Sequence, residues 1–333
     1  MLPKFYHIIF VLLFVVAFSG PGKAQLCLPA ISGDNVISKC DYCQCSQGIS
    51  PMETGSTGIR FDIGSLYLGA PYTGSARQPN PDNVNESFLT NRITLSYRIS
   101  TSPFTVSLGV PYVVRKSEEP GGNGLPLQTF KADGIGDIVT TVRFNHKHYI
   151  DESMVAFSIS AGAKLATGKS DLTLLSGGYL DPDLQPGTGT TDMLFGAAGF
   201  WSLDRIGVGA NATVGIVTGR GAPEAGGQYH KYGNYINGEI NARYRIVPAE
   251  INESNLSLTL GLGAETRAHE TSGGRQIENS GGSIIYIAPG FKYIISASMS
   301  ADGVVQIPIH QYLGGNGQLG QNYRILAGMQ YLL

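Results

Sequence analysis

Apolar and polar residues alternate along most of the chain from residue 57 to its C-terminus. The alternation is clearest at the end, where every second position is apolar or aromatic: Tyr323, Ile325, Ala327, Met329, Tyr331 and Leu333. The positions between them include Arg324, Gly328 and Gln330. A period of two predicts a β-strand, and a strand with one apolar and one polar face suits a wall between hydrocarbon and water.

The same pattern recurs in segments of about ten to fifteen residues that are separated by turn-forming residues. It predicts twelve strands, at 57–70, 88–100, 104–115, 137–147, 154–166, 191–202, 206–218, 234–246, 256–267, 283–295, 302–310 and 322–333. An even number of strands is typical of single-chain bacterial barrels. The predicted fold is therefore all-β, a transmembrane antiparallel up-and-down β-barrel of about 12 strands.

The connections between these segments alternate in length. Five are short, at 101–103, 148–153, 203–205, 247–255 and 296–301, and six are longer, at 71–87, 116–136, 167–190, 219–233, 268–282 and 311–321. Tight periplasmic turns and longer outer loops are typical of outer-membrane barrels. We therefore expect a Gram-negative outer-membrane protein with both termini in the periplasm. The sequence leaves open whether the loop 167–190 folds into the pore.

The membrane interface gives a second test of this topology. Aromatic residues form belts at both interfaces, so strands that run toward the periplasm should end near an outward-facing aromatic side chain. The six candidates all have the lipid-facing parity: Tyr97, Phe144, Trp201, Tyr244, Tyr293 and Tyr331. This agreement favours a membrane barrel over a soluble β-sandwich or a solenoid.

The N-terminal residues have the features of an export signal. Lys4 is followed by eleven apolar residues, 8–18, and then by small residues up to Ala24. This order predicts a signal peptide cleaved before Gln25, and the apolar run is short for a membrane-spanning helix, although an N-terminal anchor is the alternative. We expect a signal peptide at 1–24, a periplasmic cysteine-rich segment at 25–56 and the barrel at 57–333.

The composition agrees with a membrane barrel. Only 14% of the residues are charged, against about 25% in a typical soluble domain. Beyond the N-terminal region no apolar run is long enough for a transmembrane helix. The net charge of −2 gives no reason to expect nucleic acid as a partner. The expected partners are outer-membrane lipid, the barrel-assembly machinery and a small-molecule solute, and we expect a monomer.

The polar face of the predicted strands is rich in charge. The residues that we expect to line the lumen are Arg92, Arg98, Arg115, Arg143, Lys164, Glu239, Arg243, Arg245, Glu265, Arg267 and Arg324, and Arg60, Asp62 and Asp192 share their face. One interpretation is a pore that favours anionic or polarisable aromatic solutes, because wall charges set the field inside a pore. The other is structural, because pairs of arginine and carboxylate also fill the interior of a narrow barrel.

All four cysteines precede the first predicted strand: Cys27, Cys40, Cys43 and Cys45. An even count in an oxidising periplasm favours disulfides, most easily with Cys27 paired to one of the other three. The alternative is a metal site at Cys40, Cys43 and Cys45, because clustered thiolates suit copper or zinc. Free or partner-linked thiols are the third interpretation. No other cofactor is expected.

Five motifs, taken in order, resemble one family. They are Gly134-Ile-Gly-Asp-Ile138, Lys164-Leu-Ala-Thr-Gly-Lys169, Gln185-Pro-Gly-Thr-Gly-Thr-Thr-Asp192, Gly281-Gly-Ser-Ile-Ile-Tyr-Ile-Ala-Pro-Gly290 and Val305-Gln-Ile-Pro-Ile309. Together they resemble the outer-membrane transporter family labelled "MetA-pathway of phenol degradation". The resemblance is good across residues 130–333 and loose across residues 57–129. That family usually has a proline where this chain has Ala166. The resemblance implies transport across the outer membrane and brings no catalytic residues.

The sequence contains no nucleophile elbow, zinc-protease motif, P-loop or dinucleotide fingerprint, so we expect no enzyme. The leading hypothesis is a channel or transporter for small solutes, with aromatic and anionic compounds as candidates. A second hypothesis is a barrel that anchors the cysteine-rich segment as a periplasmic metal- or partner-binding module. A third is an outer-membrane lipid hydrolase, which would need a Ser/His pair on the lipid face or the rim.

Overall fold

The computed structural model describes residues 57–99, 102–121, 125–150, 153–175, 177–246, 254–296 and 298–333. The predicted signal peptide and the cysteine-rich segment with Cys27, Cys40, Cys43 and Cys45 lie outside the described residues. The described residues make up the wall of the molecule and the loops that connect its strands.

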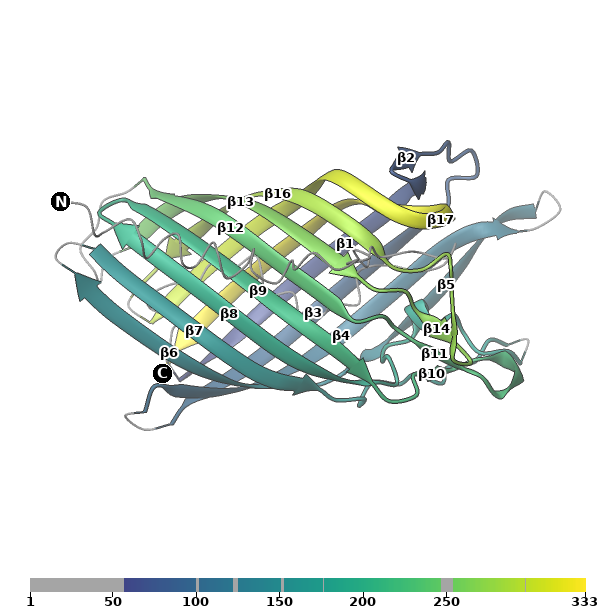
Figure 1. Cartoon of the computed structure of the whole chain (residues 1–333), viewed down its shortest axis with the longest axis horizontal. Coiled ribbons are helices and arrows are strands. Elements are labelled where there is room, and N and C mark those ends of the chain that lie inside the picture. Colours follow the sequence, from purple (N-terminus) through teal and green to yellow (C-terminus); the bar gives the residue numbers. More distant parts are fainter. Residues whose placement is uncertain are drawn as a thin grey trace, which may run out of the picture.

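The wall is one antiparallel sheet that closes on itself (Figure 1). Its strands follow the order β17 (Met299–Leu332), β16 (Gly282–Ile294), β13 (Asn255–Arg267), β12 (Tyr235–Arg245), β9 (Ile206–Thr218), β8 (Thr191–Leu203), β7 (Ser153–Lys164), β6 (Val139–Ile150), β4 (Phe104–Gly121), β3 (Asn85–Arg98) and β1 (Gly58–Gly74). β1 pairs with β17 from Gly58 opposite Leu332 onward, and this pairing closes the barrel. Two shorter strands extend the wall, β2 (Ala76–Arg77) beside β1 and β5 (Leu125–Ile135) beside β4.

β17 supplies two segments of the wall. Its first arm pairs with β16, whereas its second arm pairs with β1. The arms turn at Gly315 and Gly317, which both have positive φ, and they meet again where Leu332 N–H donates to Ser298 O at 2.7 Å. Among the described residues, ten other strands and these two arms make twelve wall segments, in agreement with the predicted number.

The strand bounds follow the prediction closely except at 311–321 and 116–136, which were both predicted as loops. At 311–321, β17 continues, because its two arms stay paired with β16 and β1 up to the turn at Gly315 and Gly317.

At 116–136 the chain forms a hairpin. There β4 continues to Gly121 and β5 returns beside it. The β4 arm escapes detection because its inner face is polar: Arg115 and Ser117 are buried although neither is apolar. The β5 arm escapes detection because its outward residues Thr129, Lys131 and Asp133 are polar. From inside, Phe130 and Ala132 of β5 are covered by another part of the chain.

The two faces of the wall have the predicted parity. On β1, Ile59 and Phe61 are exposed, whereas Arg60 and Asp62 are buried in the interior. Every strand of the wall carries such exposed aliphatic or aromatic residues, and a surface of this extent requires an apolar environment. Among the described residues, no helix is long and apolar enough to cross a membrane.

The two ends of the barrel differ. Short connections lie at the end where Leu333 N–H donates to Thr57 O at 2.9 Å, which we call the short-turn end. The six aromatic residues predicted for one interface lie toward this end, and five of them are exposed: Tyr97, Trp201, Tyr244, Tyr293 and Tyr331. The ring of the sixth, Phe144, is half-buried because it packs between Phe104 and Phe157.

The opposite, long-loop end carries structure of its own (Figure 1). Loops 219–234 and 268–281 form a small sheet with the order β10 (Ala222–Pro223), β11 (Tyr229–Lys231), β14 (Thr271–Ser272) and β15 (Arg275–Gln276). A 3-10 turn, η4 (Ala225–Gly227), connects β10 to β11. A second 3-10 turn, η3 (Pro182–Leu184), belongs to the connection between β7 and β8.

Candidate functional site

The connection between β7 and β8, residues 165–190, folds into the long-loop end of the barrel. Its Leu180 and Leu184 are buried in one apolar cluster with side chains of the inner wall: Leu66 and Leu68 of β1, Phe88 of β3, Ala132 of β5 and Leu319 of β17. In the strand order, β1 and β17 lie on the far side of the ring from β7 and β8. The loop therefore crosses the interior, which settles the question that the sequence left open. We call residues 165–190 the constriction loop.

The constriction loop has a fixed internal structure. Leu180 N–H donates to Leu172 O at 2.8 Å, and Thr173 forms a bridge with Tyr179. Gln185 has no exposed surface: its Oε1 accepts from Leu172 N–H at 2.9 Å, and its Nε2 donates to the carbonyls of Leu172 and Leu180. Because every polar atom of this amide is used, Gln185 holds the two limbs of the loop together.

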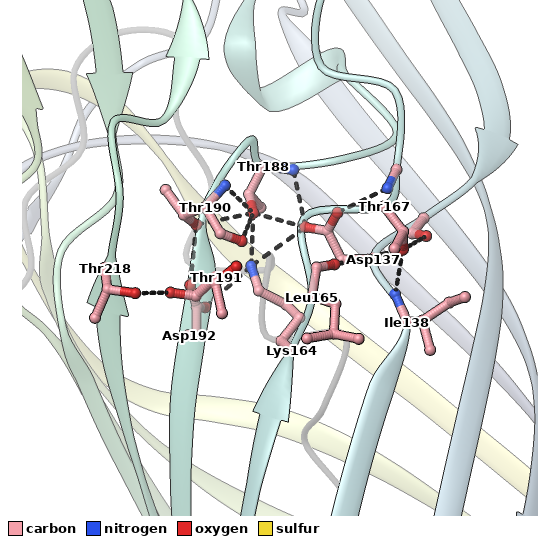
Figure 2. A network of polar contacts seen from close by, with 12 residues as sticks. Asp137, Ile138, Lys164, Leu165, Thr167, Thr188, Thr190, Thr191, Asp192 and Thr218 are labelled. Carbon is pink, nitrogen blue, oxygen red and sulfur yellow. Dashed lines mark hydrogen bonds and ion pairs between the residues drawn. The ribbon is translucent and has the colours of Figure 1, made fainter.

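Lys164, the last residue of β7, is the centre of a buried polar network at the stems of the constriction loop (Figure 2). Its Nζ lies 3.0 Å from Asp192 Oδ2 and 3.4 Å from Asp137 Oδ2, and it donates to Thr188 Oγ1 at 2.7 Å. Asp192 belongs to β8, and Asp137 lies in the bend between β5 and β6. All four side chains are buried. The ammonium group thus joins two carboxylates that come from separate parts of the wall.

Asp137 accepts three hydrogen bonds from the constriction loop. Its Oδ1 accepts from Gly168 N–H at 2.9 Å, and its Oδ2 accepts from Thr188 N–H at 2.9 Å and from the Thr188 hydroxyl at 2.6 Å. On the other side, Thr190 Oγ1 donates to Asp192 Oδ1 at 2.9 Å. One carboxylate at the bend therefore fixes both the start and the end of the loop. We call Asp137, Lys164, Thr188, Thr190 and Asp192 the anchor.

Glycine residues let the stems of the loop meet at the anchor. Gly187 N–H donates to Lys169 O at 2.8 Å, and a Cβ on Gly187 would lie 2.3 Å from the carbonyl of Gly168. A Cβ on Gly168 would lie 2.6 Å from Gly187 Cα and 2.9 Å from the carbonyl carbon of Gly136. No side chain fits in these spaces, so the two backbone segments can come this close only because both residues are glycine.

The anchor brings together the first three sequence motifs. Asp137 comes from Gly134–Ile138, Lys164 begins the second motif, and Thr188 and Asp192 belong to the third. The sequence indicated Lys164 as an inward-facing residue but gave no role to Asp137, Thr188 or Thr190. In the sequence, each of these three residues directly follows a glycine. That pattern indicates a close contact only if the three motifs are assumed to lie together in the fold.

The structure distributes the other residues expected in the lumen by depth. Seven of the eleven are buried: Arg92, Arg115, Lys164, Glu239, Glu265, Arg267 and Arg324. Three toward the short-turn end are half-buried: Arg143, Arg243 and Arg245. Arg98 is exposed and donates to Ser102 O at 3.3 Å in a short turn.

Some of these residues form ion pairs inside the barrel. Arg60 donates to both carboxylate oxygens of Asp302 at 3.0 Å and to Asp62 at 2.7 Å. Arg92 also donates to Asp62, at 3.2 Å, and Arg324 donates to Glu265 at 3.2 Å. This part of the charged interior agrees with the structural interpretation.

Other arginines lie against aromatic rings. The guanidinium carbon of Arg115 lies 5.0 Å from the ring centre of Phe88, and that of Arg267 lies 5.0 Å from Tyr235. Toward the short-turn end, Arg243 lies 4.7 Å from the ring centre of Phe200. Stacked arginines keep their positive charge while their flat faces are covered.

The described residues offer no group of three or more His, Cys, Asp or Glu side chains arranged to hold a metal ion. At the anchor, the Lys164 ammonium takes the position between two carboxylates that a cation would need. The metal or disulfide predicted at Cys40, Cys43, Cys45 and Cys27 falls outside the described residues and stays a prediction.

Comparison with known proteins gives information about the fold of this chain. No protein-family model and no curated protein matches the sequence, so the family resemblance of the motifs stays a prediction. A similar solved structure is an outer membrane channel from Pseudomonas putida F1, with a TM-score of 0.59 and 12% identity over 86% of this chain and 100% of that one. The chain therefore has the fold of an outer-membrane β-barrel.

Weaker likenesses involve autotransporters. The transport unit of the autotransporter AIDA-I from Escherichia coli gives a TM-score of 0.49 at 12% identity, over 91% of this chain and 99% of that one. The β-domain of the Bordetella autotransporter BrkA gives 0.46 at 11% identity, over 84% and 100%. At these scores neither likeness supports an argument about function.

Proposed function

We propose that this protein is an outer-membrane channel or transporter for small solutes, and that the constriction loop determines what passes at its long-loop end. The observation that carries the proposal is the anchored loop inside a closed barrel. A barrel that served only as a membrane anchor would not need a structured loop across its interior. The apolar outer surface and the charged interior support the same assignment.

The proposed solutes are small anions, including aromatic ones. Carboxylates neutralise much of the charge in the middle of the barrel, but toward the short-turn end Arg143, Arg243, Arg245 and Lys292 give a basic excess. A mouth lined by one sign of charge raises the local concentration of ions of the opposite sign. The guanidinium of Arg243, which covers the buried ring of Phe200, is only half-buried and is the group that a flat aromatic anion could contact.

The proposed orientation places the short-turn end in the periplasm. Its support is the ring of exposed aromatic residues and the tight turns, which are typical of the periplasmic side. In this orientation the cysteine-rich segment 25–56 would enter the periplasm, and the constriction loop would face the cell exterior.

Planar-bilayer recording of the purified protein and of a loop-shortened variant tests the function. Because Lys169 and Gly187 are already hydrogen-bonded to each other, a short Gly-Ser linker can replace 170–185 without moving the anchor. We expect a small, anion-selective current from the native chain and a several-fold larger one from the variant. A bilayer without current above background for both proteins, although both are folded, would overturn the proposal.

Selectivity has its own variant. Replacing Arg243 and Arg245 by Gln removes two positive charges near the short-turn end, so the reversal potential in a salt gradient should shift toward cations. The matched control is Arg275→Gln, which changes an exposed residue of β15 at the other end. Equal reversal potentials in the two variants would contradict the role of the basic mouth.

A further inference from the structure

Three loops meet around one buried histidine at the long-loop end. His230 of β11 is 2% exposed, and its Nε2 lies 2.9 Å from Glu270 Oε2 in the loop 268–281. Its Nδ1 lies 3.2 Å from Glu224 Oε1, beside η4. Glu224 also accepts a hydrogen bond from the Ser272 hydroxyl. The imidazole therefore joins loop 219–234 to loop 268–281.

The same cluster reaches the constriction loop. The ring of Tyr232 packs edge-on against His230, with 4.9 Å between the ring centres, and its hydroxyl donates to Asp183 of η3. Asp183 is fully buried. Below this contact the backbones of the two loops touch, since a Cβ on Gly189 would lie 2.6 Å from the carbonyl of Gly221. His230 is therefore linked through Tyr232 to the loop that crosses the barrel.

Acidic groups outnumber basic ones around the imidazole. Glu224 and Glu270 contact it, Asp181 and Asp183 face Tyr232 from the constriction loop, and Arg267 faces Glu270 from β13. Burial raises the pKa of Glu270, and Asp183 raises it further, while His230 and Arg267 oppose the shift. Burial and the nearby Asp183 also raise the pKa of the Tyr232 hydroxyl, so that group remains a hydrogen-bond donor.

We propose that His230 and Glu270 form a proton-dependent latch, which holds the constriction loop in place at acidic pH and releases it as the pH rises. The role of the latch in transport rests on the proposed channel function, whereas the contacts that form the latch do not. The latch connects the loops that cover the long-loop end, so its release would open the path through the barrel.

The direction of the pH effect follows from proton linkage. A carboxyl group whose pKa is raised in the closed latch binds a proton more tightly there than in the open state. Its contribution is complete below the ordinary glutamate pKa and is lost as the pH rises through the raised value. The imidazole, when it is protonated, acts in the same direction, because its charge lies between the carboxylates of Glu224 and Glu270. Both groups thus favour the closed latch in acid.

Hydrogen–deuterium exchange of the folded full chain tests the latch without requiring any current. Corrected for intrinsic rates, amides of 172–185 should exchange about tenfold faster or more at pH 8 than at pH 5.5. Glu270→Gln mimics the protonated group and should keep the slow exchange at the higher pH. His230→Gln removes the cation and should give fast exchange at both.

The controls are matched by position. Glu278→Gln changes an exposed carboxylate in the same loop, and His148→Gln changes an exposed histidine near the short-turn end, so both should behave like the native chain. If His230→Gln does not fold, the native chain and Glu270→Gln still decide the question. Native exchange that is the same at both pH values, or equal responses of Glu270→Gln and Glu278→Gln, would overturn the latch.

Conductance then separates this proposal from the proposed function. A current that grows with pH in the native chain but stays low in Glu270→Gln supports both. Exchange that depends on pH in a protein that carries no current supports the latch and overturns the channel. A steady current together with exchange that is independent of pH supports the channel and overturns the latch.

Discussion

Asp137 and Thr188 are 51 residues apart in the chain, yet the Thr188 hydroxyl donates to the Asp137 carboxylate at 2.6 Å. Through this contact the bend between β5 and β6 holds the last part of the loop that joins β7 to β8. A carboxylate that is buried and fully used by donors is a strong restraint, because each donor left without it would remain buried and unpaired. Asp137, a residue outside the constriction loop, is therefore one of the groups that set its position, together with the apolar cluster.

Replacing Asp137 with Ala should release the constriction loop. Gly168 N–H, Thr188 N–H and the Lys164 ammonium would lose an acceptor in a buried region, at a cost of roughly 3 kcal/mol to the local stability of the loop. We expect faster hydrogen–deuterium exchange over 165–190 and a larger bilayer current. Asp171→Ala is the control, since Asp171 is exposed in the same loop. Equal exchange in the two variants would show that the anchor does not restrain the loop.

The apolar contact of the loop with the far wall can be tested separately. Leu184 is 3% exposed in the cluster with Leu66 and Leu68, so Leu184→Ala should destabilise the closed loop by about 2–5 kcal/mol. The measurement is again exchange of 165–190, together with the frequency of channel opening. Leu175→Ala provides the comparison, because Leu175 in the same loop is fully exposed. An equal effect of both substitutions would mean that the cluster does not hold the loop.

The wall could be predicted from the sequence because its structure is local. Alternation of side chains follows from the strand itself, so 206–218 was predicted with the bounds that β9 has. Lys164, which has the inward parity, is buried. Where the outward positions of a strand are polar, as Thr129, Lys131 and Asp133 of β5 are, the pattern carries no signal. The hairpin of β4 and β5 was missed for this reason.

The constriction loop could not be predicted in the same way, because its position depends on contacts between distant segments. Gln185 and Asp137 have no periodic neighbours, and their hydrogen-bond partners are brought near only by the closed barrel. One signal was present on β1, where the inner positions change from charged at Arg60 and Asp62 to apolar at Leu66 and Leu68. Apolar residues on the lumen side of a barrel must be shielded from water by other apolar side chains. Leu180 and Leu184 of the constriction loop provide that contact.

Close packing of the stems gives a third prediction. Gly187→Ala places a Cβ 2.3 Å from backbone atoms of Gly168, which cannot move aside as a side chain would. The two stems must therefore separate, and the contacts of Thr188 with Asp137 should weaken. We expect exchange of 165–190 to increase at least tenfold, while the folded barrel survives in detergent. Gly178→Ala in the same loop meets nothing within 4 Å and has no positive φ, so it should behave like the native chain.

The closure of the barrel should depend on Arg60 and Asp302. Arg60 of β1 crosses over Gly328 in the second arm of β17 to form two hydrogen bonds of 3.0 Å with Asp302 in the first arm. Asp302→Ala would remove two hydrogen bonds from the buried Arg60 guanidinium, and loss of one partner of a buried pair costs about 3–5 kcal/mol. We expect a lower temperature for the loss of the folded band on a semi-native gel.

A second substitution reaches the same contact from the other side. A Cβ on Gly328 would lie 2.0 Å from a guanidinium nitrogen of Arg60, so Gly328→Ala should displace the side chain and lower the unfolding temperature as Asp302→Ala does. Asp82→Ala, in an exposed turn at the long-loop end, is the control. Because both substitutions act through one contact, the double variant should lose little more than either alone. Additive losses would show that Arg60 does not join the two arms of β17 to β1.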